Sequence, residues 1–379
     1  MYVTRTLSYY RRNPSELLGA APRGPPHSGL MVLRERGVAD EEGRGFFRDG
    51  YSKGLFKKLP LPSNAMLLNT YSDFGEYFIF IPLLQHVFSN RYYVIHADGK
   101  YKGLASRCST EADVTYCCSR KIIQDVEPRP FDHRDELQQF EICSDGDAGF
   151  HAKPVVPCSF TPTFLRFKFY LFVKNKRIYQ LQDDAKGIDE SIRSCLPELD
   201  SSALNMIIGK WYTPFVFVKE RSLNFQMVKS LFYTVTLERM WENIYSWEND
   251  GRESRGNSVA LNVEIKREVD FLFGVEVLRR DGIDNEGFIW FGSGGEEVGL
   301  SSTVFEGMRW LEESVGWLDG VERVERVVEI GGDGGGWRRI DCYVLVERFA
   351  LRRMDGTLVL NCDFRHTHEI RTKWEKFDY

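Results

Sequence analysis

The sequence has 379 residues, of which 42% are hydrophobic and 28% are charged, and its formal net charge is -5 at pH 7. This length and apolar content suit one large or two ordinary domains and make a soluble globular protein the default. The longest apolar run, residues 77–84, contains a proline and is too short to cross a bilayer, and the eight irregularly spaced cysteines do not form a disulfide framework.

Charge is unevenly distributed along the chain. By residue count, residues 1–60 carry about +5 and residues 238–336 about -12. So acidic a C-terminal half would repel phosphate backbones, and we expect no nucleic-acid partner. The first fifteen residues lack acids and contain three arginines, which faintly resembles an organelle transit peptide. Because an ordinary basic N-terminus looks the same, we expect a cytoplasmic or nuclear protein in preference to an organelle protein.

Composition divides the chain into three stretches. Residues 1–64 are rich in proline, glycine, arginine and serine, which indicates a largely irregular N-terminal segment with one short strand at residues 29–34. Residues 65–152 are predicted to form a β-rich N-terminal part. Residues 153–379 are predicted to form an α+β C-terminal part.

The N-terminal part contains three short runs of β-branched, aromatic and apolar residues. These runs predict strands at 77–84, 90–96 and 103–108, and Asp98-Gly99 predicts a hairpin turn between the last two. Pro128-Arg129-Pro130 predicts an extended connector. A helix is then predicted to begin at Asp132 or His133 and to end at Glu141.

The C-terminal part begins with a helix start at Thr161-Pro162, followed by strands predicted at 215–218 and 231–235. Four apolar residues then recur at helical spacing and predict a helix over 237–247 capped by Thr236: Leu237, Met240, Trp241 and Ile244. The order of elements in 211–242 is echoed in 337–375. This echo indicates either a duplicated strand-strand-helix unit or the chance similarity of two β-rich stretches.

The final third has the clearest local patterns. Alternating apolar residues predict strands at 259–265, 269–273, 275–278 and 288–291. A helix is predicted over 300–315, capped by Ser301 or Ser302 and ended by Gly316. A last hairpin is predicted from strands at 342–349 and 358–364 joined by a turn at 354–357. The predicted fold class is therefore α+β and β-rich, with mostly antiparallel sheets and a few packed helices.

No complete sequence motif identifies a catalytic or a cofactor-binding residue. The sequence therefore does not indicate which cofactor, if any, the protein uses. The stretch 292–295 is glycine-rich, but Glu297 stands where a dinucleotide fingerprint needs glycine, and Glu296 would repel a pyrophosphate. The Gly-x-Ser-x-Gly pentapeptide of many serine hydrolases does not occur. The pairs Glu296-Glu297 and Glu312-Glu313 are interpreted as ordinary solvated charges. The cysteines at 108, 117 and 118 are interpreted as structural thiols.

The sharpest candidate site is His366-Thr367-His368 at the end of the last strand. Because alternate strand residues face the same way, Cys362, His366 and His368 would share one surface. Two imidazoles and one thiolate could bind zinc and leave a fourth position for water. The alternative, which we prefer because no further ligand can be identified, is that the histidines pack beside Trp374 and are chemically inert.

Several stretches resemble a land-plant family of uncharacterised proteins known as domain of unknown function 1262. The resemblance covers essentially the whole chain and rests on these segments: Met1-Tyr2-Val3-Thr4-Arg5, Asn90-Arg91-Tyr92-Tyr93-Val94, Gln124-Asp125-Val126, Pro128-Arg129-Pro130-Phe131, Gln138-Gln139-Phe140, Gly209-Lys210-Trp211-Tyr212, Thr236-Leu237-Glu238, Gly336-Trp337-Arg338-Arg339, residues 342–349, Met354-Asp355-Gly356 and His366-Thr367-His368. It implies one family-specific unit with a retained N-terminus, and it implies no activity, cofactor or partner. Thr6 stands where the family pattern has proline, and Ser119 follows the cysteine pair where further cysteines are expected, which weakens a metal role for Cys117 and Cys118.

Two functional hypotheses follow. The first is a non-enzymatic binding or regulatory protein that uses an aromatic sheet surface to hold a protein partner or a small apolar ligand, since 14% of the residues are aromatic and no catalytic set is complete. The second is a metal-dependent enzyme centred on His366 and His368, with Cys362 as a further ligand.

Overall fold

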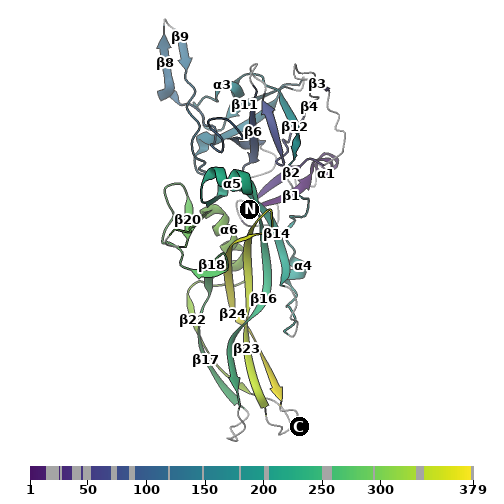
Figure 1. Ribbon diagram of the computed structural model, residues 1–379, viewed down its shortest axis with the longest axis vertical. Coiled ribbons are helices and arrows are strands. Elements are labelled where there is room, and N and C mark those ends of the chain that lie inside the picture. The colour runs from purple at the N-terminus through teal and green to yellow at the C-terminus, as the bar shows by residue number, and fades with distance from the viewer. Residues whose placement is uncertain are drawn as a thin grey trace.

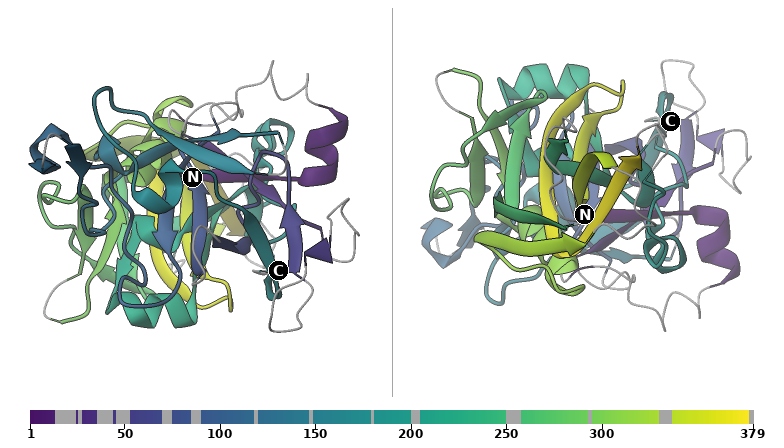
Figure 2. Two further views of the ribbon diagram at one scale, coloured as in Figure 1. Left: turned by 90° about the horizontal axis from the view of Figure 1, so that it is seen from above. Right: turned by 90° about the horizontal axis from the view of Figure 1, so that it is seen from below.

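The computed structural model describes residues 1–13, 25, 28–35, 44–45, 53–69, 75–84, 90–117, 120–146, 149–178, 181–199, 205–249, 258–292, 295–329 and 337–376. Strands supply most of this structure, and the molecule is elongated (Figure 1). Strands from the N-terminal half form its upper part, and long strands from the C-terminal half extend to its lower end. The two end-on views place helix α1 (Leu7–Arg12) at the outer edge of the molecule (Figure 2).

The upper part is built on an eight-stranded antiparallel sheet with the order β11-β10-β7-β6-β5-β12-β4-β3. Its strands are β3 (Arg44–Gly45), β4 (Lys53–Phe56), β5 (Ala65–Asn69), β6 (Glu76–Pro82), β7 (Arg91–His96), β10 (Gln139–Ser144), β11 (Phe150–Pro154) and β12 (Leu171–Ile178). Strands β6 and β7 confirm the predictions at 77–84 and 90–96. Strand β12 pairs with both β4 and β5, so this sheet recruits chain from beyond residue 153.

The lower part is built on a nine-stranded sheet with the order β19-β18-β24-β23-β16-β14-β1-β2, and β13 also pairs with β14. Its strands are β1 (Tyr2–Thr6), β2 (Gly29–Leu33), β13 (Gly187–Ile188), β14 (Met206–Pro214), β16 (Phe232–Glu248), β18 (Glu268–Leu272), β19 (Val275–Val277), β23 (Trp337–Arg353) and β24 (Leu358–Lys376). Apart from the parallel pair β1 and β2, the described neighbours are antiparallel. The final hairpin is confirmed, and its strands extend well beyond the predicted ends.

Three smaller sheets complete the β structure that the described residues form. Their strands are β15 (Val218–Glu220), β21 (Val298–Ser301) and β20 (Phe288–Phe291); β17 (Ser258–Lys266) and β22 (Val321–Glu329); and β8 (Val114–Cys117) and β9 (Arg120–Ile123). The ribbon of β17 and β22 runs beside the long strands (Figure 1). Leu261, Ile265 and Val324 of this ribbon pack against Cys342 of β23, so the lower end has a small hydrophobic core of its own.

In the part of the chain that the structure describes, helices are few and short. They are α1, α3 (Thr163–Arg166), α4 (Glu190–Arg193), α5 (Leu223–Lys229) and α6 (Ser302–Glu313), with 3₁₀ segments η2 (Glu111–Asp113), η3 (Glu136–Gln138) and η4 (Phe215–Phe217). The predicted helix at 300–315 is confirmed as α6, which has Ser301 at its N-cap and is followed by Gly316 at φ 92°. Among the described residues, no helix has the length and apolarity needed to span a membrane. The β-rich, mostly antiparallel character is thus confirmed.

Most of the aromatic rings that the structure describes lie in the core. The largest fully buried side chains include Trp211, Trp317 and eight phenylalanines of the two main sheets and their connections. Among the described aromatic residues, the exposed ones are Tyr116, Phe167, Phe273 and Trp310, which lie in four separate segments of the chain. The aromatic content is therefore used mainly to fill the space beneath the sheets, and a binding site has to be sought in the pockets.

The helix predicted over 237–247 is wrong, because these residues belong to the 17-residue strand β16. Strand β23 pairs with β16 along its length, from Tyr233 opposite Arg353 to Glu248 opposite Arg339, and β14 pairs with the first part of β16 as far as Arg239. Four apolar residues at helical spacing are a local signal, and pairing with these neighbouring strands overrides it. The proposed strand-strand-helix duplication loses its helix with this correction.

Other predictions in the N-terminal half also need correction. The helix expected from Asp132 to Glu141 is replaced by η3 and β10, which pairs with β7. The strand expected at 103–108 is reduced to isolated bridges of Ala105, and Phe215–Phe217 is a 3₁₀ turn before β15. Strands β1, β14 and β22 were not predicted. The glycine-rich stretch at 331–336 lies outside the described residues.

The Trp211 side chain packs so closely against Gly209 in β14 that position 209 has no room for a side chain. A Cβ atom added at Gly209 would lie 2.6 Å from the Trp211 indole. We therefore expect Gly209→Ala to lower the free energy of unfolding by about 1–3 kcal/mol, because the buried ring has to move. Urea unfolding followed by circular dichroism measures this loss.

The matched control for Gly209 is the same substitution in a Trp211→Phe background. Phenylalanine lacks the part of the indole that approaches Gly209, so Gly209→Ala should be less destabilising there. An equal loss in both backgrounds would show that the contact with Trp211 is not the cause.

Candidate functional site

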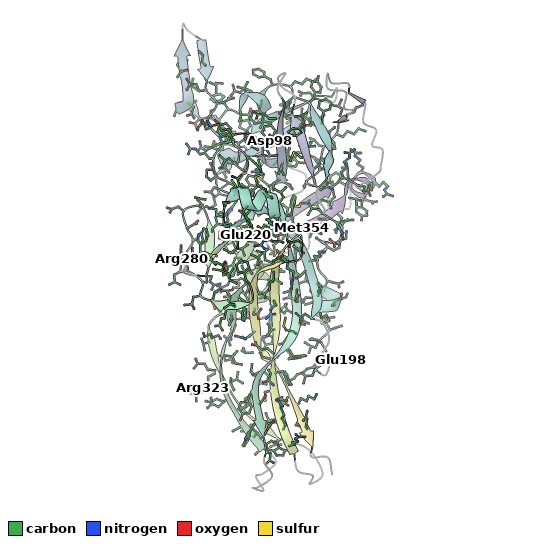
Figure 3. All side chains as sticks on the ribbon, in the orientation of Figure 1. Asp98, Glu198, Glu220, Arg280, Arg323 and Met354 are labelled. Carbon is green, nitrogen blue, oxygen red and sulfur yellow. The ribbon has the colours of Figure 1, made fainter. Side chains whose placement is uncertain are left out.

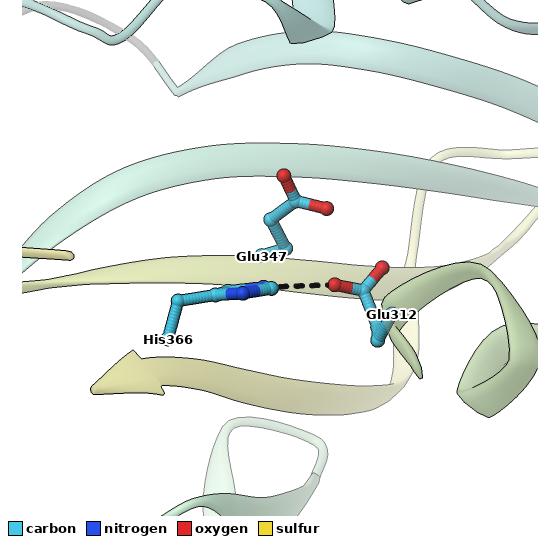
Figure 4. A group of neighbouring side chains, drawn as sticks. All are labelled: Glu312, Glu347 and His366. Atoms are coloured by element: carbon cyan, nitrogen blue, oxygen red, sulfur yellow. Dashed lines mark hydrogen bonds and ion pairs between the residues drawn. The ribbon is translucent and has the colours of Figure 1, made fainter. Parts of the chain in front are cut away.

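Five ionisable side chains meet beneath α6 on one face of the nine-stranded sheet. Figure 4 shows three of them, Glu312, Glu347 and His366. They come from α4, β16, α6, β23 and β24: Arg193, Arg239, Glu312, Glu347 and His366. The side chains of all five are less than a tenth exposed. We call this group the ionic cluster.

Glu347 is the centre of the ionic cluster. Its carboxylate accepts hydrogen bonds from Nη2 of Arg193 at 2.5 Å and from Nε of Arg239 at 2.9 Å. Arg239 and Glu347 are direct cross-strand partners in β16 and β23, so the sheet register itself creates this ion pair. Arg239 also donates to the backbone oxygen of Cys195 at 2.8 Å, which ties the turn after α4 to the sheet.

Glu312 and His366 form the second half of the ionic cluster. Nε2 of His366 lies 2.9 Å from a Glu312 carboxyl oxygen, and the other Glu312 oxygen is 3.3 Å from Arg193. Burial raises the pKa of Glu312 well above its ordinary value, and the neighbouring Glu347 raises it further. Burial lowers the pKa of His366 to about 4. Burial therefore favours the uncharged form of both groups.

Glu347 is the charged carboxylate of the ionic cluster. Burial by itself would raise the pKa of Glu347, but Arg193 and Arg239 overcome this effect and lower the pKa below its ordinary value. One ionised carboxylate thus faces two guanidinium groups. Arg193 completes its contacts with the backbone oxygen of Leu311 at 3.2 Å, at the end of α6. The cluster holds α4, α6 and three long strands together.

The ionic cluster also contains a possible set of metal ligands. Ligand atoms of Glu312, Glu347 and His366 lie within 4.8 Å of one another. A divalent cation there would have to compete with Arg193 and Arg239 for the oxygens of Glu347 and would meet their positive charge. The geometry therefore favours a structural network of ion pairs over a metal site.

The three metal ligands predicted from sequence separate in the structure. His366 is buried in the ionic cluster, whereas His368 is exposed, although the two rings remain in contact with centroids 5.4 Å apart. Cys362 is buried beside Asp270 of β18, where burial raises its pKa well above the ordinary value. A bulge interrupts the alternation of β24, since Leu345 pairs with His366 and the adjacent Val344 with Ile370.

Sequence reasoning missed four of the five cluster residues. Glu312 was interpreted as a solvated charge, and this is wrong, because its side chain is fully buried. A signal was present: Glu312 lies one position after Leu311 and four after Met308, on the apolar face of α6. A carboxylate on the core face of a helix indicates a buried partner.

A pocket of about 470 Å³ opens beside the ionic cluster, between the end of α6, the β17 and β22 ribbon, and β24. Trp317, Val315 and Leu318 supply an apolar wall. His366, Thr367 and His368 form the opposite wall, so this pocket contains the histidine pair that the sequence singled out. We call it the histidine pocket.

Three arginines line the histidine pocket. Arg267 is paired with Glu322 and also donates to the Thr367 hydroxyl at 3.1 Å. Arg365 forms two hydrogen bonds with Glu242, at 2.6 and 2.8 Å. Arg326 is exposed on β22 and forms no ion pair with any residue that the structure describes. The pocket therefore offers a free positive charge next to an apolar wall.

The fold and these pockets define a β-rich protein without an assigned activity. A family model described as "Protein of unknown function (DUF1262)" matches residues 24–119. This match supports the family resemblance for that stretch and leaves the function uncharacterised. No match is found among curated proteins.

Among solved structures, the one titled "Crystal structure of Cry35Ab1" overlaps with 83% of this chain and 90% of that chain. The sequence identity is 11% and the TM-score is 0.40. An overlap at this level does not define a common fold.

Proposed function

We propose that the protein is a binding protein whose site is the histidine pocket, and that its ligand has an apolar body and one acidic group. The observation that carries this proposal is the guanidinium of Arg326, which forms no ion pair with a described residue, at a pocket whose exposed apolar side chains are Val315 and Leu318. Apolar walls with a few placed polar groups are typical of small-ligand sites. This site replaces the aromatic sheet surface considered from sequence, and a cytoplasmic or nuclear location stays a prediction.

Charge in the histidine pocket favours an anion. Glu322 and Glu242 neutralise Arg267 and Arg365, so Arg326 is the charge that a ligand can pair with. His366 is buried and its pKa is lowered to about 4, whereas the exposed ring of His368 beside it offers an edge for a flat ligand.

Calorimetric titration with a series of carboxylates, such as phenylacetate and octanoate, tests the proposal. We expect the acids to bind and their uncharged amides to bind about tenfold more weakly or not at all. Arg326→Ala should weaken binding of the acids by about tenfold or more. Equal affinity for acids and amides, or an unchanged affinity in Arg326→Ala, would contradict the proposal.

The matched control is Arg323→Ala. Arg323 lies on the same strand (Figure 3), is exposed and pairs with Glu325. It is three positions from Arg326, hence on the opposite face of β22, and it does not line the pocket. Its substitution removes the same charge and should leave the affinity unchanged.

The alternative proposal is a metal-dependent enzyme, for which Cys362, His366 and His368 were considered from sequence. The observation in its favour is the proximity of Glu312, Glu347 and His366. Titration with zinc chloride in place of the carboxylates separates the two proposals. Zinc binding that is lost when His366 and His368 are both replaced by alanine would favour the metal site over the anion site.

A further inference from the structure

A second pocket, of about 230 Å³, lies in the upper part of the molecule and holds a serine, a histidine and a carboxylate. Glu76 is the first residue of β6, His96 is the last residue of β7, and Ser106 lies in the segment that follows β7. No sequence motif marks these residues. They lie outside the histidine pocket and the ionic cluster.

The three side chains are arranged in the order of a nucleophile, a base and an orienting acid. Oγ of Ser106 lies 3.0 Å from Nε2 of His96, and Nδ1 of His96 lies 3.8 Å from Oε2 of Glu76. The two nitrogens of one imidazole thus face the hydroxyl and the carboxylate separately. Serine hydrolases use the same connection on unrelated folds.

Sheet register produces this arrangement. His96 is the cross-strand partner of Phe78, and Glu76 precedes Phe78 by two residues, so Glu76 and His96 share one face of the sheet. Backbone hydrogen bonds from Ser106 to Val94 at 2.9 Å and from His96 to Leu104 at 2.9 Å fix the serine beside the imidazole.

The surroundings hold His96 in one orientation and in its neutral form. Its ring packs edge-on against Phe78 and Phe164, with centroids 4.8 and 6.1 Å away. Burial lowers the pKa of His96 to about 4, so the imidazole is neutral at pH 7, and in the tautomer with its proton on Nδ1, facing Glu76, the Nε2 atom can accept the Ser106 proton. Glu76 remains largely exposed, with its carboxylate at the pocket mouth.

The rest of the pocket suits a short acyl group. Val126, Pro162 and Phe164 form an apolar wall. Arg107 also lines the pocket, and its hydrogen bond to Asp135 at 2.9 Å engages only Nε. The terminal amino groups of Arg107 are therefore donors that the developing negative charge on a carbonyl oxygen could use.

We propose that Ser106 and His96, oriented by Glu76, form a site that hydrolyses short-chain carboxylic esters. Oγ of Ser106 forms a bond to the ester carbonyl carbon while its proton passes to Nε2 of His96. The C–O bond to the alcohol then breaks, and the alcohol leaves with that proton. Water attacks the acyl-serine by the same route, so that the carboxylic acid is released and Ser106 regains its proton.

Hydrolysis of p-nitrophenyl acetate by the full chain tests the proposal. We expect turnover above the rate in buffer, and Ser106→Ala should lower kcat/KM by about 100-fold or more. Glu76→Gln, at a largely exposed position, should lower kcat by about tenfold and leave KM unchanged, as befits a positioning residue. His151→Ala is the control for acyl transfer to surface histidines and should leave the rate unchanged.

A fluorophosphonate probe gives a second measurement. Attack by Ser106 forms an Oγ–P bond and expels fluoride, so peptide mass spectrometry should find the adduct on Ser106 and on no other serine. The proposal is overturned if Ser106 carries no adduct, or if folded Ser106→Ala hydrolyses the ester as fast as the unmodified protein. If Ser106→Ala does not fold, an unchanged kcat in Glu76→Gln overturns it.

Discussion

Replacement of Glu347 by glutamine is expected to lower the free energy of unfolding by about 3–5 kcal/mol. The Glu347 carboxylate is fully buried and faces the guanidinium groups of Arg193 and Arg239, which are themselves at most 7% exposed. Glutamine would leave both buried guanidinium groups without the carboxylate that they share, and the remaining nearby carboxyl group, Glu312, has a pKa that burial raises. Urea unfolding at pH 7 measures the loss.

The control for this substitution is Glu242→Gln. Glu242 also forms two hydrogen bonds with one arginine, Arg365, but its side chain is 38% exposed. Water can solvate whatever the substitution leaves unpaired, so the expected loss is at most about 1 kcal/mol. If both variants lose the same free energy of unfolding, burial is not the reason why the ionic cluster stabilises the fold.

The second large effect concerns pH and Asp270 of β18. Burial, with Glu268 and Asp363 nearby, raises the pKa of Asp270 from 3.8 to about 7 in spite of Arg279. The folded state therefore holds a proton that the unfolded chain has already lost. The resulting stability is fully present below pH 3.8 and is lost as the pH rises through 7.

Asp270→Asn should remove this pH dependence, because an amide stays uncharged. Between pH 5 and pH 8.5, the difference in free energy of unfolding between the variant and the unmodified protein should move by about 3 kcal/mol in favour of the variant. The lowered pKa values of His96 and His366 act in both proteins and cancel in this difference. Unfolding curves at the two pH values provide the measurement.

Asp355→Asn is the control for Asp270. Asp355 lies in the exposed turn between β23 and β24, and hydrogen bonds from Thr357 lower its pKa. Asp355 is ionised above pH 5 in both the folded and the unfolded protein. Its removal should therefore not change how the free energy of unfolding varies from pH 5 to pH 8.5. If the free energy of unfolding varies with pH in the same way in Asp270→Asn and in the unmodified protein, the buried carboxyl group of Asp270 is not the cause of the pH dependence.

Local sequence patterns correctly predicted the helices and strands that depend on residues close together in the sequence. Asp355-Gly356 supplies the turn of the last hairpin, with Gly356 at φ 86°, and the apolar face defines α6, which is followed by Gly316. The strands at β6, β7, β17, β18 and β20 were predicted for the same reason. Each depends on residues within a few positions of one another.

The mispredicted elements are strands that pair with strands far away in the sequence. β16 carries a helical spacing of apolar residues, yet β14 and β23 hold it extended from positions up to 120 residues away along the chain. β1 is placed in the nine-stranded sheet by β14 and β2. A window of local sequence contains no information on which other strand will supply the hydrogen bonds.

The sequence by itself determined a β-rich, mostly antiparallel protein with its final hairpin and α6. It also singled out His366 as a candidate site residue. Only the tertiary structure decided that His366 would meet Glu312 instead of Cys362, and that Ser106 would meet His96 and Glu76. The physical reason is that charge and hydrogen-bond partners are selected by strand register and helix packing, which join positions such as Arg193 and Glu347 across 154 residues. Burial then sets the protonation of these groups, and burial is a property of the assembled sheets.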